Sequence, residues 1–313
     1  MKLYKYYKVK GTIREKIFRR VPFFTKRIRF FSWKKIVKGT NAQDMIADWI
    51  RSGKPFMVAR FGSVELRCTA ECEQYEKKKE KAFCAKTWKS MGNNAGLFPV
   101  TEENLLRFGS LMKESCSQVD LLGAWFMPME DYMLHNYMKK TILTRLWSLE
   151  PYRFANPWTM ALEGKKVLLI HPFAETIQKQ YERREKVWKE KAILPQFELQ
   201  TLKAVQSAAG EKDERFKDWF EAFDYMKAEI AKRDFDIAII GCGAYGFPLA
   251  AYIKELGKQA IHLGGATQIL FGIRGKRWEN DLGVNPYFNE FWVRPSAEET
   301  PKNNNAVEGG CYW

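Results

Sequence analysis

Three glycines follow a short apolar run late in the chain, at the spacing of a loop that can hold a phosphate. Gly241, Gly243 and Gly246 come directly after this run, and residues 248–256 are again mostly apolar. The run, Ile237–Ile240, predicts a buried strand by its length and β-branching, and the later stretch predicts a helix. Such glycines let the backbone approach a ligand, and the start of the helix offers N–H groups and a positive dipole to an anion. The pattern predicts a site for a phosphate-bearing small molecule, and tight packing of helix against strand is the alternative.

A dinucleotide cofactor is a second candidate ligand for this loop, but the next predicted strand disfavours it. Dinucleotide sites carry an acidic residue at the end of that strand, where it holds the ribose hydroxyls. In this chain His262 occupies the place and is followed by Leu263, Gly264 and Gly265. An oxidoreductase with a nucleotide cofactor of the NAD type therefore stays open as an alternative, with this feature against it.

Charged and polar residues stand at the ends of other predicted strands. The strand over 55–60 ends at Arg60, the strand over 166–171 ends at His171, and His262 lies near the end of the strand over 259–263. Ligands of open parallel sheets gather outside the carboxyl ends of the strands. We therefore expect these three ends and the glycine loop to converge on one crevice.

Glu65 lies in the first turn of a predicted helix, a few residues after Arg60. Beside a phosphate-binding loop, its carboxylate can hold a divalent metal, a sugar hydroxyl or the proton of an attacking hydroxyl. Arg60 can pair with a phosphate or with Glu65 itself. The plain alternative is that Glu65 only complements the dipole of its helix.

Further polar residues follow His262. Thr267 and Gln268 can form hydrogen bonds with a sugar or a base, and three cations nearby can neutralise a diphosphate leaving group or form a solvated turn. No Ser–His–Asp pattern, P-loop or HExxH motif is present. We predict Glu65 and His262 as catalytic residues, and Glu65 also as a metal ligand. The predicted substrate-binding residues are Arg60, Gly62, Ser63, His171, Gly241, Gly243, Tyr245, Gly246, Gly264, Gly265, Thr267, Gln268, Arg274, Lys276 and Arg277.

Predicted strands and helices alternate along most of the 313 residues. This alternation predicts an α/β fold with a Rossmann-like, mostly parallel sheet and helices on both faces. We expect one catalytic domain over 39–295, followed by a tail over 296–313 whose final rings dock on the body. Residues 135–146 are expected to be helical, and residues 197–205 fit either a strand or a short helix.

The positive charge of the chain is concentrated at its start. Residues 1–38 hold 14 Lys or Arg and one acid, a net charge of +13, whereas the remaining 38 basic and 36 acidic residues give +2. Basic residues interleaved with aromatic rings suit an anionic membrane surface. Nucleic acid is the second option for this arm, and an arm without a specific partner is the third. The sequence shows no signal peptide, and six cysteines in such a chain are typical of reduced thiols, so we expect a cytoplasmic location.

Three segments resemble a known family. The sequence ARFGSVE at 59–65, followed downstream by IIGCGAYGFPLA and AIHLGGATQILFGIRGKRW, is similar to bacterial GT-D-fold glycosyltransferases of polysaccharide-biosynthesis clusters. The resemblance covers about residues 40–295. It implies a Rossmann-like domain, a nucleotide-sugar donor and a divalent metal, with an Asp-x-Glu triplet after Arg-Phe-Gly that helps to bind both.

The match to that motif has one departure. Arg60, Phe61 and Gly62 match, Glu65 matches the glutamate, and Ser63 replaces the aspartate. Loss of one of two carboxylates weakens a site for a hard cation such as Mn²⁺ or Mg²⁺. Either Glu65 and other groups hold the metal, or the enzyme works without one, or the reaction has changed in this branch.

The resemblance and the residues together suggest a glycosyltransferase. It would move a sugar from a nucleotide diphosphate donor to a surface-glycan or lipid-linked acceptor, at the inner face of the membrane, where residues 1–38 would hold it peripherally. No specific nucleic acid is expected as a partner. A non-catalytic nucleotide-sugar binder is an alternative, because Ser63 replaces the aspartate.

Overall fold

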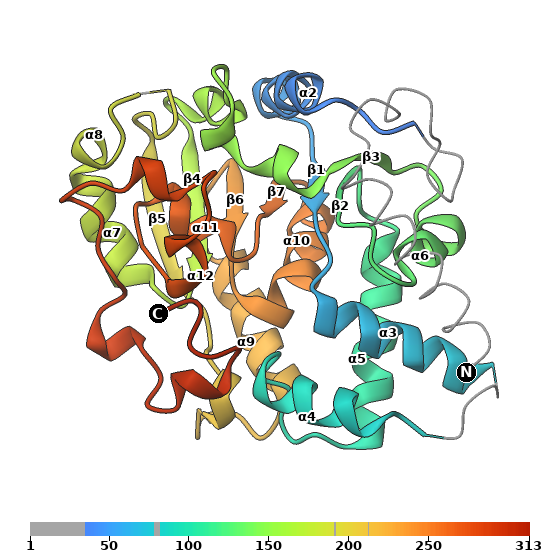
Figure 1. The fold of residues 1–313 in the computed structure, drawn as a ribbon. Coiled ribbons are helices and arrows are strands. Elements are labelled where there is room, and N and C mark those ends of the chain that lie inside the picture. Colours follow the sequence, from blue (N-terminus) through green and yellow to red (C-terminus); the bar gives the residue numbers. More distant parts are fainter. Residues whose placement is uncertain (1–34, 78–81, 191, 212) are drawn as a thin grey trace.

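The protein is built around a sheet of seven parallel strands (Figure 1). The computed structural model describes residues 35–77, 82–190, 192–211 and 213–313, so most of the predicted basic arm lies outside the described residues. The strand order is β3-β2-β1-β7-β6-β4-β5. The strands are β1 Phe56–Ala59, β2 Leu121–Ala124, β3 Ile142–Arg145, β4 Lys166–His171, β5 Glu198–Lys203, β6 Ile237–Ile240 and β7 Gln259–His262.

Helices cover both faces of the sheet, and each face has its own apolar core. One core packs α3, α5, α9 and α10 against the sheet, and the other packs α2, α7, α8 and α11. The central strands are buried on both sides, which explains their continuous apolar runs. The predicted α/β class is confirmed. The helices are α2 Gly39–Ser52, α3 Ser63–Glu76, α4 Ala85–Asn93, α5 Glu102–Cys116, α6 Glu130–Tyr137, α7 Ala174–Glu182, α8 Arg184–Val187, α9 Trp219–Ala231, α10 Gly246–Glu255, α11 Ala266–Leu270 and α12 Lys276–Glu279.

Local sequence signals account for several helix ends. Thr101 accepts a hydrogen bond from the backbone N–H of Asn104 at the start of α5, with an N–O distance of 3.1 Å. Gly53 ends α2 in the left-handed conformation, at φ 68°, which glycine adopts without the clash of a side chain. At α3 the N-cap is Gly62, and Ser63 is the first helical residue.

The helix predicted over 135–146 is wrong after Tyr137. Helix α6 ends at Tyr137, and Ile142–Arg145 forms the edge strand β3, which pairs in parallel with β2. Three of these four residues are aliphatic or β-branched, so pairing with the neighbouring strand prevails over the helical pattern. The undecided segment 197–205 contains strand β5.

The segment after residue 296 lies against the body through a buried carboxylate. Glu299 accepts hydrogen bonds from the backbone N–H groups of Glu175 and Thr176, at 2.8 and 3.3 Å, and from the hydroxyl of Thr176. These N–H groups open α7 and have no acceptor within their own helix. Glu299 therefore caps a helix that lies more than a hundred residues earlier in the chain.

Across the described residues, we find no helix that combines the length and the apolar character needed to span a bilayer.

Candidate active site

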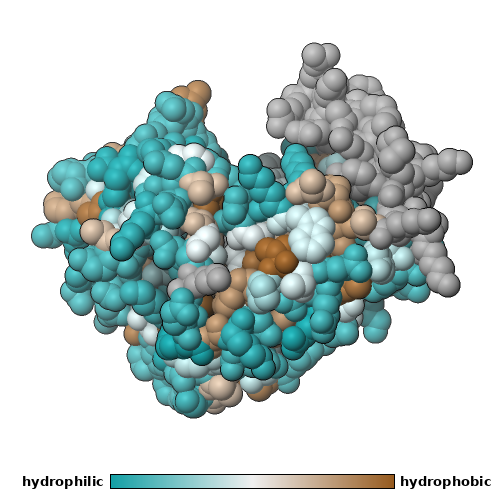
Figure 2. Space-filling model, turned by 90° about the horizontal axis from the view of Figure 1, so that it is seen from below, coloured by the Kyte–Doolittle hydropathy of each residue, from teal (hydrophilic) through white to brown (hydrophobic). Residues whose placement is uncertain are grey.

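A cavity lies at the carboxyl ends of four neighbouring strands, β1, β7, β6 and β4. Its empty volume, including the part open to solvent, is about 1220 Å³. Arg60, His171, Gly241 and His262, which end or follow these strands, all line it. Figure 2 looks onto this end of the molecule, where a mostly hydrophilic surface surrounds a small hydrophobic area. The four strand ends singled out in the sequence thus meet at one cavity.

Glu65 lines this cavity from the first turn of α3, and Gly62 makes its position possible. A Cβ atom added to Gly62 would lie 1.9 Å from Oε2 of Glu65, so any larger residue would displace the carboxylate. Burial raises the pKa of Glu65, against the opposing effects of its own backbone N–H and of the positive charge of Arg60. The carboxyl group is therefore a better proton acceptor than an exposed glutamate.

Arg60 places a positive charge near Glu65. Its guanidinium lies over the ring of Trp125, with 4.3 Å from Cζ to the ring centroid, and such a contact favours the charged form. Burial lowers the pKa of Arg60, whereas Tyr312 and Glu65 raise it. An arginine keeps its charge in proteins, so the cavity contains a cation in addition to the carboxylate.

The loop that carries Trp125 is held by a buried glutamate that the sequence analysis did not single out. Glu130 accepts hydrogen bonds from the backbone N–H groups of Trp125, Phe126 and Met127, at 3.2, 2.6 and 3.2 Å. Burial raises the pKa of Glu130 to about 7, although these hydrogen bonds lower it. Glu130 thus orients Trp125, and through it Arg60, without lining the cavity itself.

The glycines of the β6–α10 turn serve different purposes. Gly243 has φ 56°, and a Cβ added there would meet nothing within 4 Å, so this turn is open. A Cβ on Gly241 would lie 2.7 Å from the ring of His171, and one on Gly246 would lie 2.5 Å from Nε2 of His262. Close packing therefore explains why residues 241 and 246 are glycines. Of the three glycines, only Gly243 has open space beside it in which a ligand could approach the backbone.

Both histidines at the cavity are buried and neutral. Burial lowers the pKa of each to about 3, and the charge of Arg60 lowers that of His262 further. Nδ1 of His171 accepts a hydrogen bond from the backbone N–H of Phe173 at 3.0 Å, which leaves the proton of the neutral ring on Nε2. Nδ1 of His262 is buried without a hydrogen-bond partner among the described residues. Neither ring supplies positive charge at neutral pH.

The end of the chain forms one wall of the cavity, through Val307, Glu308, Tyr312 and Trp313. Arg277, on α12, forms an ion pair with Glu308 and donates a hydrogen bond to the hydroxyl of Tyr312 at 3.0 Å. In the structure, then, a carboxylate of this segment contacts a cation that we expected to face a diphosphate.

Four predicted substrate-binding residues do not line the cavity. Thr267 is fully buried, and its hydroxyl donates to the carbonyl of Ile240 at 3.3 Å. Gly246 packs against His262, as described above. Arg274 and Lys276 lie on the same segment as Arg277, but of these three cations only Arg277 lines the cavity. The predicted residues that line it are Arg60, Gly62, Ser63, Glu65, His171, Gly241, Gly243, Tyr245, His262, Gly264, Gly265, Gln268 and Arg277.

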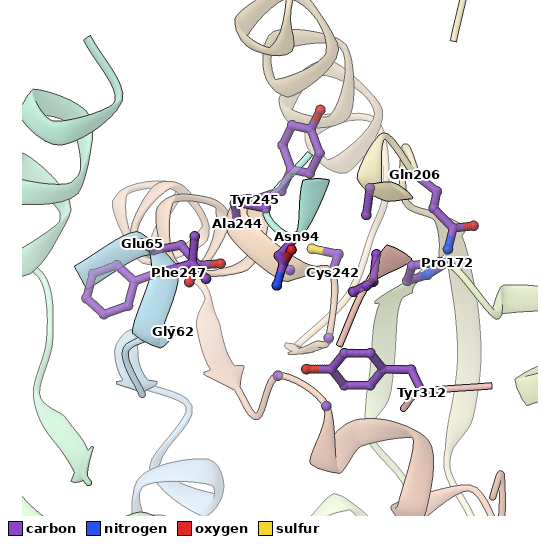
Figure 3. Close-up of a pocket in the computed structure, with 18 of the residues that line it drawn as sticks. Gly62, Glu65, Asn94, Pro172, Gln206, Cys242, Ala244, Tyr245, Phe247 and Tyr312 are labelled. Carbon is purple, nitrogen blue, oxygen red and sulfur yellow. The ribbon is translucent and has the colours of Figure 1, made fainter. Parts of the chain in front are cut away.

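The cavity also contains residues that we did not predict. Figure 3 shows Asn94, Gln206 and Tyr312 around it, together with Glu65. Asn94 follows α4 and Gln206 follows β5, and neither stands in a recognisable motif. Tyr312 belongs to the aromatic end of the chain. The expected docking of these rings on the body was the one signal in the sequence that could have indicated its place at the cavity.

The described residues do not by themselves form a metal site. They contain no group of three His, Cys, Asp or Glu side chains placed to hold one ion. Glu65 offers one carboxylate, Ser63 lies nearby on α3, and the carboxylate of Glu308 is paired with Arg277. Mg²⁺ and Mn²⁺ prefer a larger set of oxygen ligands. A divalent ion would need most of its ligands from a bound substrate.

Comparison with known proteins gives a similarity of fold. No family model and no curated protein matches the chain. Two solved structures match 86% of this chain and 96% of their own, with 14% identity and a TM-score of 0.44. Both are of a domain of unknown function, DUF1792, and one is described as showing that this domain has a distinct glycosyltransferase fold. At this level the similarity concerns the fold alone.

Proposed function

We propose that this protein is a glycosyltransferase that takes a sugar from a nucleotide diphosphate donor. One observation carries the proposal: a half-buried carboxylate, two arginines and an open helix-start turn line the same cavity. In this proposal the N–H groups near Gly243 and the guanidinium of Arg277 bind the diphosphate, and Arg60 lies between it and Glu65. Helix N-termini and arginine side chains are both suited to phosphate oxygens.

The proposed reaction exchanges one bond of the anomeric carbon for another. Its bond to the diphosphate oxygen breaks, and a bond to an acceptor hydroxyl oxygen forms. The hydroxyl proton passes to the carboxylate of Glu65, and the nucleoside diphosphate leaves with the bonding electrons. Burial favours Glu65 as the proton acceptor, since it raises the pKa of the carboxyl group toward neutrality. Arg277 would stabilise the negative charge that develops on the leaving group.

The neutral histidines have a positioning role in this proposal. His262 is buried, and burial lowers its pKa to about 3, so it is a poor base at neutral pH. Its place on the cavity wall suits contact with the donor. We therefore give proton transfer to Glu65 and orientation of the donor to His262.

We extend the proposal to a divalent metal only together with the donor. With a metal, Glu65 would supply one ligand in place of its role as proton acceptor, and the two phosphates would supply others, as is common for Mg²⁺. Protein purified without nucleotide is then expected to contain no stoichiometric Mn²⁺ or Mg²⁺, as measured by elemental analysis. Tightly bound metal in the nucleotide-free protein would contradict this arrangement.

We also propose that residues 1–38 hold the enzyme at an anionic membrane surface, where lipid-linked acceptors lie. This part rests on the sequence alone, through the net charge of +13 and the interleaved aromatic residues. Removal of residues 1–38 should abolish binding to anionic liposomes and leave donor turnover unchanged. Liposome binding that survives the removal would refute it.

A non-catalytic nucleotide-sugar binder is the second candidate, because Ser63 replaces the aspartate of the resembled motif. Donor turnover in wild type and in Glu65→Gln separates the two. We expect the variant to bind the donor and to lose turnover by about a hundredfold or more. Glu103→Gln is a matched control, since Glu103 also lies in the first turn of a helix, α5, but is exposed and outside the cavity. Equal turnover of Glu65→Gln and wild type would remove the role of Glu65, and binding without any turnover in wild type would favour the binder.

A further inference from the structure

A second, open groove lies beside the first cavity and shares two residues with it. Val205 and Gln206, which follow β5, line both. The other wall of the groove comes from residues 297–302, in the segment that leads to the end of the chain. A ligand in the groove would therefore extend from the surface to the edge of the proposed donor site.

The chemistry of the groove differs from that of the first cavity. Among the described residues that line it, the charged side chains are three basic and four acidic, a net charge of −1 by count, and most are at least partly exposed. Such a surface does not attract a polyanion, whereas its carboxylates, ammonium groups and hydroxyls can form many hydrogen bonds with a neutral ligand rich in hydroxyl groups. The charged residues are Lys203, Arg215, Lys302, Glu211, Asp213, Glu214 and Glu298.

One side of the groove is held in place by an arginine. Arg215 donates to both carboxylate oxygens of Asp213, at 2.9 Å from Nε and 2.6 Å from Nη2. Its guanidinium also lies over the rings of Phe216 and Tyr225, with centroid distances of 4.9 and 5.1 Å. Tyr225 lines the groove and is half-buried, so it presents part of a fixed ring to a ligand.

Gln206 stands at the junction of the groove and the cavity. The chain around it is fixed, because the N–H of Ala204 donates to the carbonyl of His171 at 3.2 Å and the hydroxyl of Ser207 donates to that of Gly96 at 2.7 Å. Gln206 itself is half-buried, and its side-chain amide has no hydrogen-bond partner among the described residues. An amide both donates and accepts, which suits a sugar hydroxyl.

From these features we infer that the groove binds the acceptor as a neutral oligosaccharide, with its reacting hydroxyl directed past Gln206 toward Glu65; this inference rests on the proposed function. Gln206 is then a positioning residue for the acceptor, and Glu211, residues 213–215 and residues 297–302 flank the sugars behind it. The near balance of charge selects a neutral glycan over a uronic-acid polymer or a nucleic acid.

The test uses the full chain and an array of immobilised neutral and uronic-acid oligosaccharides. We expect binding to neutral members, and we expect Gln206→Leu and Glu214→Ala each to weaken it about threefold to tenfold, as for the loss of one or two hydrogen bonds. Glu103→Ala, an exposed glutamate outside both cavities, should leave binding unchanged. Thermal unfolding of every variant checks that the fold is kept.

Three results would overturn the inference: no glycan bound, preference for the acidic oligosaccharides, or neutral-glycan binding that neither substitution weakens. Thermal unfolding of the wild-type protein with a panel of nucleoside diphosphates separates the failure of this inference from the failure of the proposed function. Nucleotide binding without glycan binding would refute the acceptor groove alone. Glycan binding without nucleotide binding would refute the donor site.

Discussion

The two strand–turn–helix units at the cavity, β1–α3 and β6–α10, differ in the side chains for which their glycines make room. In β1–α3, Gly62 leaves room for the carboxylate of Glu65, which lines the cavity. In β6–α10, Gly241 and Gly246 leave room for the rings of two buried histidines, and only Gly243 is open. The spacing of glycines in the sequence therefore does not show which glycine can contact a ligand. The structure shows it, through the atoms that a Cβ at each glycine would meet.

The largest effect is expected at Gly62. In Gly62→Ala, the added Cβ would lie within 2 Å of the present Oε2 position, so the Glu65 carboxylate must move. We expect donor turnover to fall about a hundredfold, as for Glu65→Gln, because proton transfer requires the carboxylate in place. Steady-state kinetics measures the loss, and thermal unfolding shows whether the fold is kept. Turnover of Gly62→Ala at the wild-type rate would show that Gly62 is not needed to place the Glu65 carboxylate.

Substitution in the other unit should reduce stability more than binding. Gly246 has helical backbone angles, so alanine there meets only the steric conflict with His262, which we expect to cost about 1–3 kcal/mol. Gly243→Ala is the contrasting variant. Its Cβ meets open space, but its left-handed backbone costs about 1–2 kcal/mol and the turn changes shape. Nucleotide affinity should fall more in Gly243→Ala, where the turn itself changes shape, than in folded Gly246→Ala, where only the ring of His262 is displaced. Calorimetry of unfolding measures the stability of both variants, and titration calorimetry measures their nucleotide affinity. A larger loss of affinity in Gly246→Ala than in Gly243→Ala would contradict this prediction.

Smaller changes in nucleoside diphosphate affinity, in opposite directions, are expected when either member of the ion pair of Arg277 and Glu308 is replaced. Loss of a charged hydrogen-bond donor to the diphosphate should weaken nucleoside diphosphate binding about tenfold in Arg277→Gln. Glu308→Gln removes the carboxylate that now contacts Arg277, and should strengthen binding by up to about fivefold, the range of a partly exposed pair. Isothermal titration in low and high salt measures both. Equal changes in the same direction would show that Glu308 does not compete with the ligand.

The smallest effect concerns pH. His171 has its pKa lowered to about 3 by burial, against an ordinary 6.5, so the unfolded chain takes up the proton first as pH falls. The histidine therefore contributes stability above pH 6.5 that is lost as pH falls toward 3, about 1 kcal/mol of it between pH 6.5 and 5.5.

His171→Asn isolates this contribution, because its side-chain oxygen can still accept from Phe173. Denaturant unfolding at several pH values should show a smaller loss of stability in this variant than in wild type over the same range. His135→Asn, at an exposed histidine, serves as the control. Parallel curves for wild type and His171→Asn would refute a neutral, buried His171.

Most of the sheet and part of the site followed from local patterns. Apolar β-branched runs predicted β4 and β6 at their observed bounds, and the rule for parallel sheets brought Arg60, His171 and His262 together. β3 was missed because a four-residue edge strand depends on its partner, which a local pattern does not contain.

The rest of the site comes from contacts between distant segments. Glu130 was missed because its role depends on three backbone N–H groups that point at it, a geometry created by the loop. Asn94 and Gln206 reach the cavity from loops that carry no motif. The prediction that three cations line the site is confirmed for Arg277 alone, because residues within one short segment point in different directions.

The cap that Glu299 provides for α7 has a consequence for how the molecule opens. Loss of this one carboxylate exposes the first N–H groups of α7 and frees the segment that leads to the cavity wall. In hydrogen–deuterium exchange, amides at the start of α7 and amides of residues 300–313 are therefore expected to exchange as a single cooperative unit, although more than a hundred residues separate them.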